Sequence, residues 1–241
     1  MISVGFKTDK GMHRGGNEDS LFILPDQQLY MVADGVGGHN SGELASRLTV
    51  GFIAQYVAIN KITSVTNEEA LREYLDICLQ GANELVFSKS EGENAGMATT
   101  VVLCYLSGNK AYIVNVGDSR AYLVREGQIH QVTTDHTYVN EMVERGVMSR
   151  EDAEGSFNKN MITRAIGAEE TVKPDFFNFE TYPGDIIILC TDGLYGEADN
   201  YTIGMIAQKA EGMHQLASDL VSTANIHGGH DNVSVVCIKI Q

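Results

Sequence analysis

Tryptophan is absent from the 241-residue sequence, and proline occurs only 3 times. The chain also lacks any Pro/Ser-rich stretch, block of like charges or low-complexity tract that would mark a linker. Its length fits one large domain or two small ones, since domains of roughly 100–200 residues are common. Without a linker, we predict one domain that spans residues 1–241.

The 4 cysteines include no Cys-x-x-Cys pair, and most of them lie in apolar runs. We therefore expect buried, reduced thiols, which are typical of a reducing compartment. The N-terminal residues 1–11 hold no apolar run long enough for a signal peptide. No stretch reaches the roughly 18 apolar residues of a membrane span. These features predict a soluble, cytoplasmic protein.

Basic residues are scarce, because 17 Lys and Arg stand against 32 Asp and Glu, for a formal net charge of −15. An acidic surface repels the phosphate backbone of nucleic acids and opposes docking on anionic membranes. We therefore expect no nucleic-acid partner and no membrane partner. Separately, we expect a monomer. Acids that collect around divalent cations are neutralised on binding, so part of this charge is a candidate metal site.

What the sequence does contain is a series of short apolar runs, bounded by Gly, Asp or Asn. They predict strands at residues 2–6, 20–24, 29–33, 99–106, 111–116, 121–125, 186–190 and 233–240. Helical periodicity marks residues 42–58 and 68–87, with Asn67 as the N-cap of the second helix, and shorter helices are predicted at 138–145, 201–209 and 214–224. Because strands arrive in runs, we predict an α+β sandwich of antiparallel sheets covered by helices. The polar stretch 144–167 is predicted to be a flap-like excursion from the core.

Four aspartates fall at the tips of predicted strands: Asp34, Asp118 and Asp192 at strand ends, and Asp231 just before the last strand. If these tips meet at one edge of the sandwich, the carboxylates converge. Carboxylates with a backbone carbonyl form the oxygen-only environment that Mg²⁺ and Mn²⁺ prefer. Two of the acids are followed by glycine, which lets the backbone turn sharply. Asp-Gly is also an ordinary turn dipeptide, so spacing alone leaves both a metal site and simple turns open.

An ordered set of motifs then resembles the bacterial members of the metal-dependent (PPM, type 2C) protein serine/threonine phosphatases. The set begins with Arg14-Gly-Gly-Asn17-Glu18-Asp19 and Val32-Ala-Asp34-Gly35-Val-Gly37-Gly38-His39. It continues with Gly42-Glu43-x-Ala45-Ser46, Ala98-Thr-Thr100, Val116-Gly-Asp118-Ser-Arg120, Asp135-His136, Thr163-Arg164-Ala-Ile-Gly167, Thr191-Asp192-Gly193 and Gly229-His-Asp231-Asn232. The resemblance runs from residue 6 to the C-terminus. Each motif alone is weak, but their order is specific.

This resemblance implies a four-layer α/β/β/α sandwich, in which two antiparallel sheets are flanked by helix pairs. It implies that Asp34 bridges two Mn²⁺ or Mg²⁺ ions and that the carbonyl of Gly35 binds one of them. Asp192 and Asp231 would hold the other ion. The implied activity is hydrolysis of phosphoserine and phosphothreonine in proteins, in opposition to a bacterial Ser/Thr kinase.

The resemblance also implies roles for residues around the two ions. Asp118 would join Asp192 in a third metal site, and Glu18 and Asp19 would orient metal-bound waters. Our hypothesis for the reaction is direct attack of a metal-bridged water on phosphorus. Arg14 would clamp two phosphoryl oxygens, since its planar fork matches them.

The source of the leaving-group proton is left open by the sequence. Many eukaryotic members have a histidine directly after the Asp-Gly pair, and this position is Val36 here. His39 could contact substrate, protonate the leaving group or cap the following helix, and we favour the last. For His13, His227 and His230 we favour loop positions, since the spacing of a zinc set is absent.

Three other functions are weighed against this one. A non-catalytic phosphoprotein-binding module would be expected to lack one of the metal acids or Arg14, and all are present. Relatives that act on anti-sigma-factor antagonists often lack this arginine and the Gly-Asp-Ser-Arg segment, both of which this chain has. A two-metal nuclease is opposed by the acidic balance.

Overall fold

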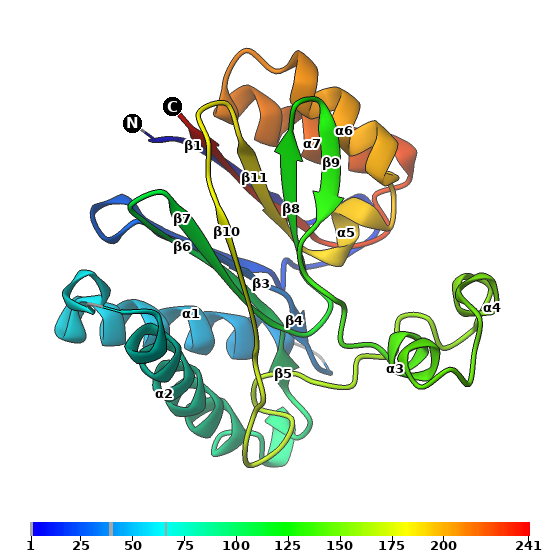
Figure 1. The fold of residues 1–241 in the computed structure, drawn as a ribbon. Helices are drawn as coiled ribbons and strands as arrows, with labels where there is room; N and C mark the ends of the chain where they lie inside the picture. Colours follow the sequence, from blue (N-terminus) through cyan, green and yellow to red (C-terminus); the bar gives the residue numbers. More distant parts are fainter. Residues whose placement is uncertain (1, 39–40, 66) are drawn as a thin grey trace.

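The computed structural model describes residues 2–38, 41–65 and 67–241, and within them two five-stranded antiparallel sheets form the centre (Figure 1). The first sheet has the order β1 (Ile2–Asp9), β12 (Val233–Ile240), β11 (Ile186–Cys190), β8 (Arg120–Arg125) and β9 (Gln128–Gln131). The second has the order β10 (Asp175–Glu180), β7 (Lys110–Val116), β6 (Val101–Ser107), β3 (Leu29–Ala33) and β2 (Ser20–Leu24). A short ribbon joins β4 (Gly35–Val36) to β5 (Ala98–Thr99).

The two sheets pack face to face through an apolar core. Val32 and Cys104 from the second sheet belong to one buried cluster with Leu189 and Val236 from the first. Alternate residues of the same strands point the other way, toward the helices, because side chains along a strand alternate between faces. Met31, for example, packs in a second cluster with residues of the helices.

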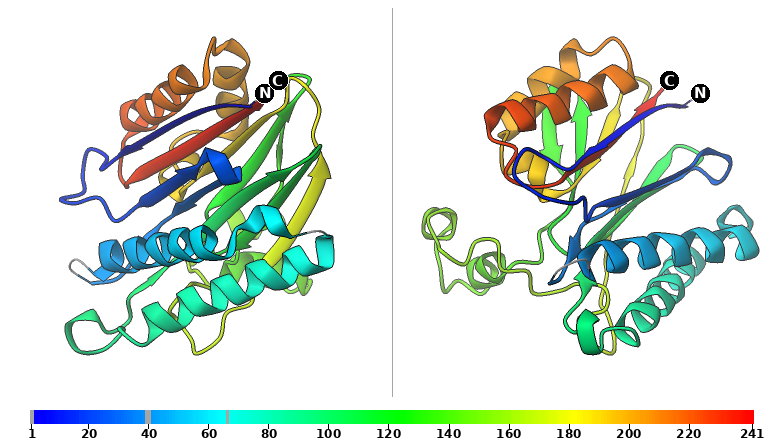
Figure 2. Two further views of the ribbon diagram at one scale, coloured as in Figure 1. Left: turned by 90° about the vertical axis from the view of Figure 1, so that its left-hand side faces the viewer. Right: turned by 180° about the vertical axis from the view of Figure 1, so that it is seen from behind.

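Helices cover both outer faces of the sandwich. The second sheet is covered by α1 (Ser41–Asn60) and α2 (Glu68–Phe87), and the first by α5 (Asp192–Tyr195), α6 (Asn200–Lys209) and α7 (Met213–His227). Figure 2 shows the resulting succession of helices, sheet, sheet and helices, with β1 and β12, the first and last strands of the chain, side by side in the first sheet. The predicted four-layer α+β sandwich is confirmed. None of the helices in the described residues is long and apolar enough to cross a membrane.

Most predicted elements are present, but the two edge strands β9 and β10 were not predicted. In β10 the polar Asn178 interrupts the apolar residues. The side chain of Asn67 accepts a hydrogen bond from the Ala70 amide at 2.9 Å, as expected for the N-cap of α2. The four cysteines are free and buried. In contrast, β9 carries no apolar run, because most of its side chains are exposed at a sheet edge. Short 3₁₀ turns at Pro25–Gln27, Ile62–Ser64 and Gly92–Asn94 complete the connections.

One segment projects from the body of the sandwich (Figure 1). It contains α3 (Tyr138–Glu144) and α4 (Arg150–Glu154). Its two stems are joined where Thr137 bridges Ile162. We call residues 138–161 the flap. The flap begins and ends earlier than the predicted excursion at 144–167, because residues 138–144 leave the body as a capped helix and residues 162–167 return along β5.

Candidate metal centre

Sheet topology brings the four strand-tip aspartates to one edge. Strands β3 and β7 are both antiparallel to β6, so Asp34 and Asp118 follow strands that end at the same edge. Strand β11 is antiparallel to β8 and β12, so Asp192 follows its end at the edge where those two strands begin. Asp231 precedes β12 there. The turn containing Asp118 connects β7 of one sheet with β8 of the other, so the two edges meet.

Asp34 is fixed through its backbone. Its amide donates to the Thr100 hydroxyl at 2.9 Å, and its carbonyl accepts from the Thr100 amide at 2.9 Å and from the Thr99 hydroxyl at 2.7 Å. Thr99 at the end of β5 and Thr100 just before β6 therefore hold the Asp34 backbone in place. The fixed backbone in turn sets the direction of the Asp34 carboxylate.

The remaining acids are held by hydroxyl groups and helix ends. The Thr191 hydroxyl donates to Asp19 Oδ2 at 2.9 Å and accepts from the Ser234 amide at 2.9 Å. Asp192 is the first residue of α5. In the described part of the chain, Asp19 Oδ1 and Asp192 Oδ1 are buried with no hydrogen-bond partner. Buried carboxylate oxygens without donors are costly, so both atoms suit an additional cation or water.

The acids also repel one another. Burial raises the pKa of Asp34 well above its usual value, and the charges of Asp19, Asp192, Asp118 and Asp231 raise it further. Burial raises the pKa of Asp19 to about 7 and that of Asp118 to about 7, with neighbouring aspartates adding to both shifts. Hydrogen bonds from Ser234 and Thr191 oppose the shift at Asp19. An oxygen-only cluster with this excess of negative charge fits a hard divalent cation.

Arg14 forms a salt bridge with Asp231, one of the expected metal ligands. Its Nη2 atom lies 2.6 Å from Asp231 Oδ2, and its Nε atom lies 3.4 Å from the His230 carbonyl. The Arg14 side chain is about half exposed, with 51% of its surface accessible. Among the described residues, no three acidic, histidine or cysteine side chains are already arranged to hold a metal ion. The chemistry of the cluster fits a cation, while the Arg14–Asp231 pair must rearrange for Asp231 to bind one.

Asn232 is a site residue for which the sequence predicted no role. Its Nδ2 group donates to the carbonyls of Lys10 and Gly16, both at 2.9 Å, and its Oδ1 accepts from the Glu18 amide at 2.8 Å. These three bonds attach the loop that carries Arg14 and Glu18 to the start of β12. The Asp-Asn pair next to a strand was the available signal, since a buried Asn needs partners.

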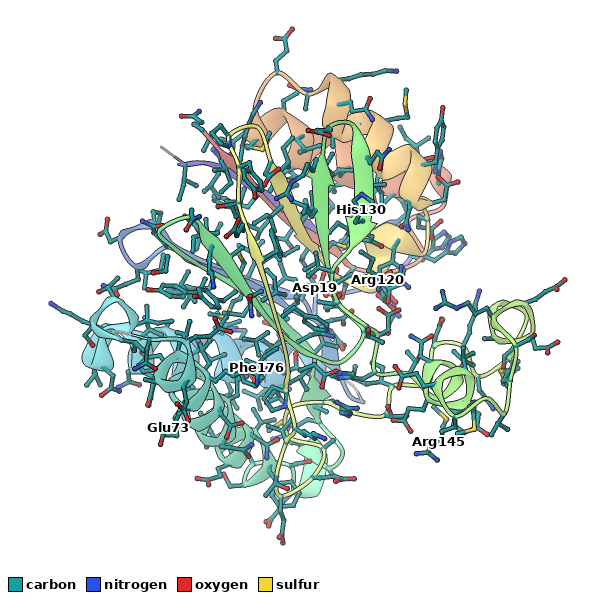
Figure 3. All side chains as sticks on the ribbon, viewed as in Figure 1. Asp19, Glu73, Arg120, His130, Arg145 and Phe176 are labelled. Atoms are coloured by element: carbon teal, nitrogen blue, oxygen red, sulfur yellow. The ribbon has the colours of Figure 1, made fainter. Side chains whose placement is uncertain are left out.

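Arg120 belongs to a second supporting network. It forms a salt bridge with Asp135 at 2.6 Å, and its guanidinium lies 3.5 Å from the centre of the Tyr195 ring. The Tyr195 hydroxyl donates to the Asp118 carbonyl at 3.0 Å. Figure 3 shows Arg120 near the level of Asp19, where the strands end. The network ties α5 to the turn containing Asp118.

The histidines have separate positions. His230 Nδ1 lies 2.7 Å from Glu197 Oε1, His227 Nδ1 lies 2.9 Å from the Glu197 carbonyl, and His13 stacks on His230 with ring centres 4.9 Å apart. His13 and His230 are the chain neighbours of Arg14 and Asp231 and lie in loops, as expected. The loop position expected for His227 was wrong, because this residue ends helix α7. His39, for which three roles were weighed, lies outside the described residues.

The glycines after two of the aspartates are required by close approach. A Cβ atom on Gly35 would lie 2.0 Å from the Gly42 carbonyl oxygen, and one on Gly193 would lie 2.0 Å from the Asn232 carbonyl oxygen. Both obstacles are backbone atoms, so no rotamer change could relieve them. Gly35 and Gly193 therefore allow the strand tips to pack against neighbouring backbone.

Substitution of Gly193 by alanine is expected to destabilise the fold by about 1–3 kcal/mol through overpacking. It should also weaken divalent-cation binding about 10- to 100-fold, because Asp192 must move with the backbone. Thermal unfolding and calorimetric Mn²⁺ titration check both effects. Gly51 is the matched control: it is exposed inside α1, and a Cβ atom there would meet nothing within 4 Å beyond its own helix backbone, so Gly51→Ala should stabilise by about 0.5–1 kcal/mol. Unchanged stability and cation binding in Gly193→Ala would contradict the packing argument.

Comparison with known proteins decides the family. Residues 13–226 match the family model described as protein phosphatase 2C. The chain belongs to the protein phosphatase 2C family. The identification made from the ordered motifs is thereby confirmed, and the named relatives in this family are serine/threonine protein phosphatases, which are hydrolases.

Similar proteins agree with the family along the whole chain. The serine/threonine phosphatase stp of Listeria monocytogenes is 34% identical over 239 residues, which are 97% of this chain and 94% of the relative. The serine/threonine phosphatase structure from S. agalactiae is 28% identical with a TM-score of 0.92, and all of both chains is covered. A structure of the catalytic domain of PstP in complex with 2 manganese ions is 32% identical with a TM-score of 0.84, covering 99% of this chain and 97% of that one.

Proposed function

We propose that this chain is a metal-dependent phosphatase that hydrolyses phosphoserine and phosphothreonine in proteins. The observation that carries the proposal is the group of mutually repelling aspartates at one edge of the sandwich, next to an arginine that is about half exposed. The acids suit divalent cations, and the arginine suits a phosphoryl group. A family relative with 2 manganese ions supports the same chemistry.

The cations we propose are Mn²⁺ or Mg²⁺. Asp34 would bridge two ions, with the Gly35 carbonyl on one and with Asp192 and Asp231 on the other. Asp118 would contribute to a third site beside Asp192. When bound, the ions supply an acidified water and offset the charge that develops on the phosphoryl oxygens.

The surrounding residues would orient the reactants. Arg14 would leave Asp231 for the phosphoryl oxygens, since its planar fork can contact two of them at once. Glu18 and Asp19 would accept hydrogen bonds from waters in the site. The hydrogen bond from the Thr191 hydroxyl to Oδ2 fixes the orientation of the Asp19 carboxylate. Val36 is exposed and apolar and cannot donate the proton that the leaving group needs. For His39 we favour the helix cap, with contact to substrate as the alternative role.

The setting of the enzyme is also proposed. We expect the partners to be phosphoproteins and a Ser/Thr kinase whose products this enzyme reverses. We further propose a cytoplasmic monomer built as one catalytic domain with the flap beside the site. Cell fractionation and light scattering of the purified protein test location and oligomeric state.

Substrate selectivity tests the proposed function. Phosphothreonine, phosphoserine and phosphotyrosine versions of one peptide should be incubated with Mn²⁺, and phosphate release measured. We expect the first two to be hydrolysed at least about tenfold faster than the third. Cleavage of DNA or RNA in preference to the peptides would identify a nuclease. Binding of phosphopeptide without turnover in Mn²⁺ or Mg²⁺ would identify a binding module.

A further inference from the structure

His136 occupies a junction of three segments that are far apart in sequence. Its ring is buried, with only 3% of the residue surface accessible. On one side lies Gly117, in the turn that carries Asp118, and on the other lie Asp175 of β10 and Arg164. Arg164 follows directly on the return stem of the flap. A buried polar ring at such a point needs satisfied partners on both nitrogens.

The hydrogen bonds fix the tautomer of the ring. The Gly117 amide donates to His136 Nδ1 at 3.1 Å, so Nδ1 carries no proton. The neutral ring then has its proton on Nε2, which lies 3.1 Å from Asp175 Oδ2 and donates to it. Arg164 Nη1 pairs with the other oxygen of the same carboxylate at 2.9 Å.

The backbone around His136 joins the same segments. The His136 amide donates to the Gly117 carbonyl at 3.0 Å, and the Thr163 amide donates to the His136 carbonyl at 2.8 Å. The next residue along, Thr137, bridges Ile162 at the base of the flap. Both flap stems therefore lie next to His136, and the ring of this residue binds the turn that carries Asp118.

The Gly117 turn has little freedom to adjust by itself. Its φ is +103°, a conformation that favours glycine, and a Cβ atom there would lie 2.6 Å from Thr100 Cγ2. Thr100 in turn bonds the backbone of Asp34 at 2.9 Å. A shift of the Gly117 amide would consequently move Thr100 and, through it, Asp34 at the metal centre.

We propose that His136 is a positioning residue that couples the orientation of the flap to the position of Asp118. The Nδ1 side of the ring holds the turn that carries Asp118, and the Nε2 side holds β10 and the return stem of the flap through Asp175. This inference rests on the proposed function for its catalytic consequence. The coupling itself is a property of the structure and can be measured without turnover.

Two substitutions separate the two sides of the ring. In His136→Asn, the side-chain oxygen stands in for Nδ1 and can accept from Gly117, but the side chain is too short for Asp175. In His136→Gln, the side-chain NH₂ stands in for Nε2 and can reach Asp175, while no acceptor faces the Gly117 amide. Asp175→Asn weakens the same bond to His136 Nε2 from the other partner. Because Asp175 is partly exposed, this variant tests the coupling even if a His136 variant does not fold.

Amide hydrogen exchange measured by NMR with Mg²⁺ gives the first readout. We expect His136→Asn and Asp175→Asn to speed exchange at Thr163 and Tyr138 about tenfold and to leave Gly117 protected. We expect His136→Gln to do the reverse. His130, exposed on β9, is the matched control, and His130→Asn should exchange like the wild type at all three amides.

Calorimetric Mn²⁺ titration and peptide kinetics give the second readout. His136→Gln should weaken Mn²⁺ binding about tenfold, as loss of a supporting hydrogen bond does at metal sites, while His136→Asn should mainly raise KM for a phosphothreonine peptide. Equal changes of every readout in both variants, with a lower Tm, would mean a merely structural role and would overturn the inference. Hydrogen exchange and Mn²⁺ binding that match those of the His130→Asn control would also overturn the inference. A wild type without phosphatase activity would instead overturn the proposed function, and the exchange pattern would still decide the coupling.

Discussion

Replacing Asp34 by asparagine is expected to abolish Mn²⁺-dependent turnover while making the metal-free protein more stable. The loss follows because Asp34 is the proposed bridge, and Lewis-acid stabilisation worth several kcal/mol corresponds to about 10³-fold in rate. The gain follows because Asp34 is crowded by Asp19, Asp192, Asp118 and Asp231, so removing one negative charge relieves repulsion. Each kcal/mol relieved should raise Tm by roughly 2–4 °C in a chain of this size.

The expected loss of turnover and the expected gain in stability are measured separately. Phosphate release is measured at saturating Mn²⁺, and thermal unfolding is measured with EDTA. Asp26→Asn is the matched control, because Asp26 is an exposed aspartate in the Pro25–Gln27 turn, and it should leave both quantities unchanged. An Asp34→Asn variant that is less stable without metal, or that keeps wild-type turnover, would contradict the proposed role.

Loss of the Arg14 guanidinium is expected to lower kcat/KM by about 100-fold with little effect on stability. Two charge-assisted hydrogen bonds to a phosphoryl group are each worth about 1.5–3 kcal/mol, part of which the half-exposed site returns to water. Arg14→Lys should recover only a small part of the loss, since an ammonium group cannot form the planar fork. Inhibition by inorganic phosphate should weaken in parallel.

A second variant separates phosphate binding from cation binding. Because Arg14 pairs with Asp231 at 2.6 Å, removing Arg14 should ease cation entry, so Arg14→Ala should bind Mn²⁺ at least as tightly as the wild type. Arg47→Ala is the matched control, since Arg47 makes only an exposed pair with Glu43 on α1. Unchanged phosphate inhibition in Arg14→Ala would remove the phosphate-clamp role.

The sequence predicted those features that short segments determine by themselves. Asp34 and Asp192 stand directly after apolar runs and before glycine, so their place at strand tips followed from local pattern. Asn67 was predicted as a cap from its position before an amphipathic run, and its side chain makes the capping bond. The order of motifs then fixed the family, which local pattern alone left open.

Features that depend on distant partners were out of reach. The Arg14–Asp231 pair joins residues 217 positions apart, and no periodicity reports such a contact. No local pattern shows that Gly117 and Asp175 lie on opposite sides of the His136 ring. Strand β9 was missed because an edge strand with exposed side chains carries little apolar signal. Strand β10, at the edge of the other sheet, was missed because Asn178 interrupts its apolar residues.

Phosphate release from a phosphothreonine peptide, followed while Mn²⁺ binding is measured on the same sample, tests the central claim most directly. We predict that turnover is absent in EDTA, rises in proportion to Mn²⁺ occupancy, and is lost in Asp34→Asn, Asp192→Asn and Asp231→Asn. Turnover that persists in EDTA, or that stays at the wild-type level in all three variants at saturating Mn²⁺, would contradict a reaction centre built from these aspartates.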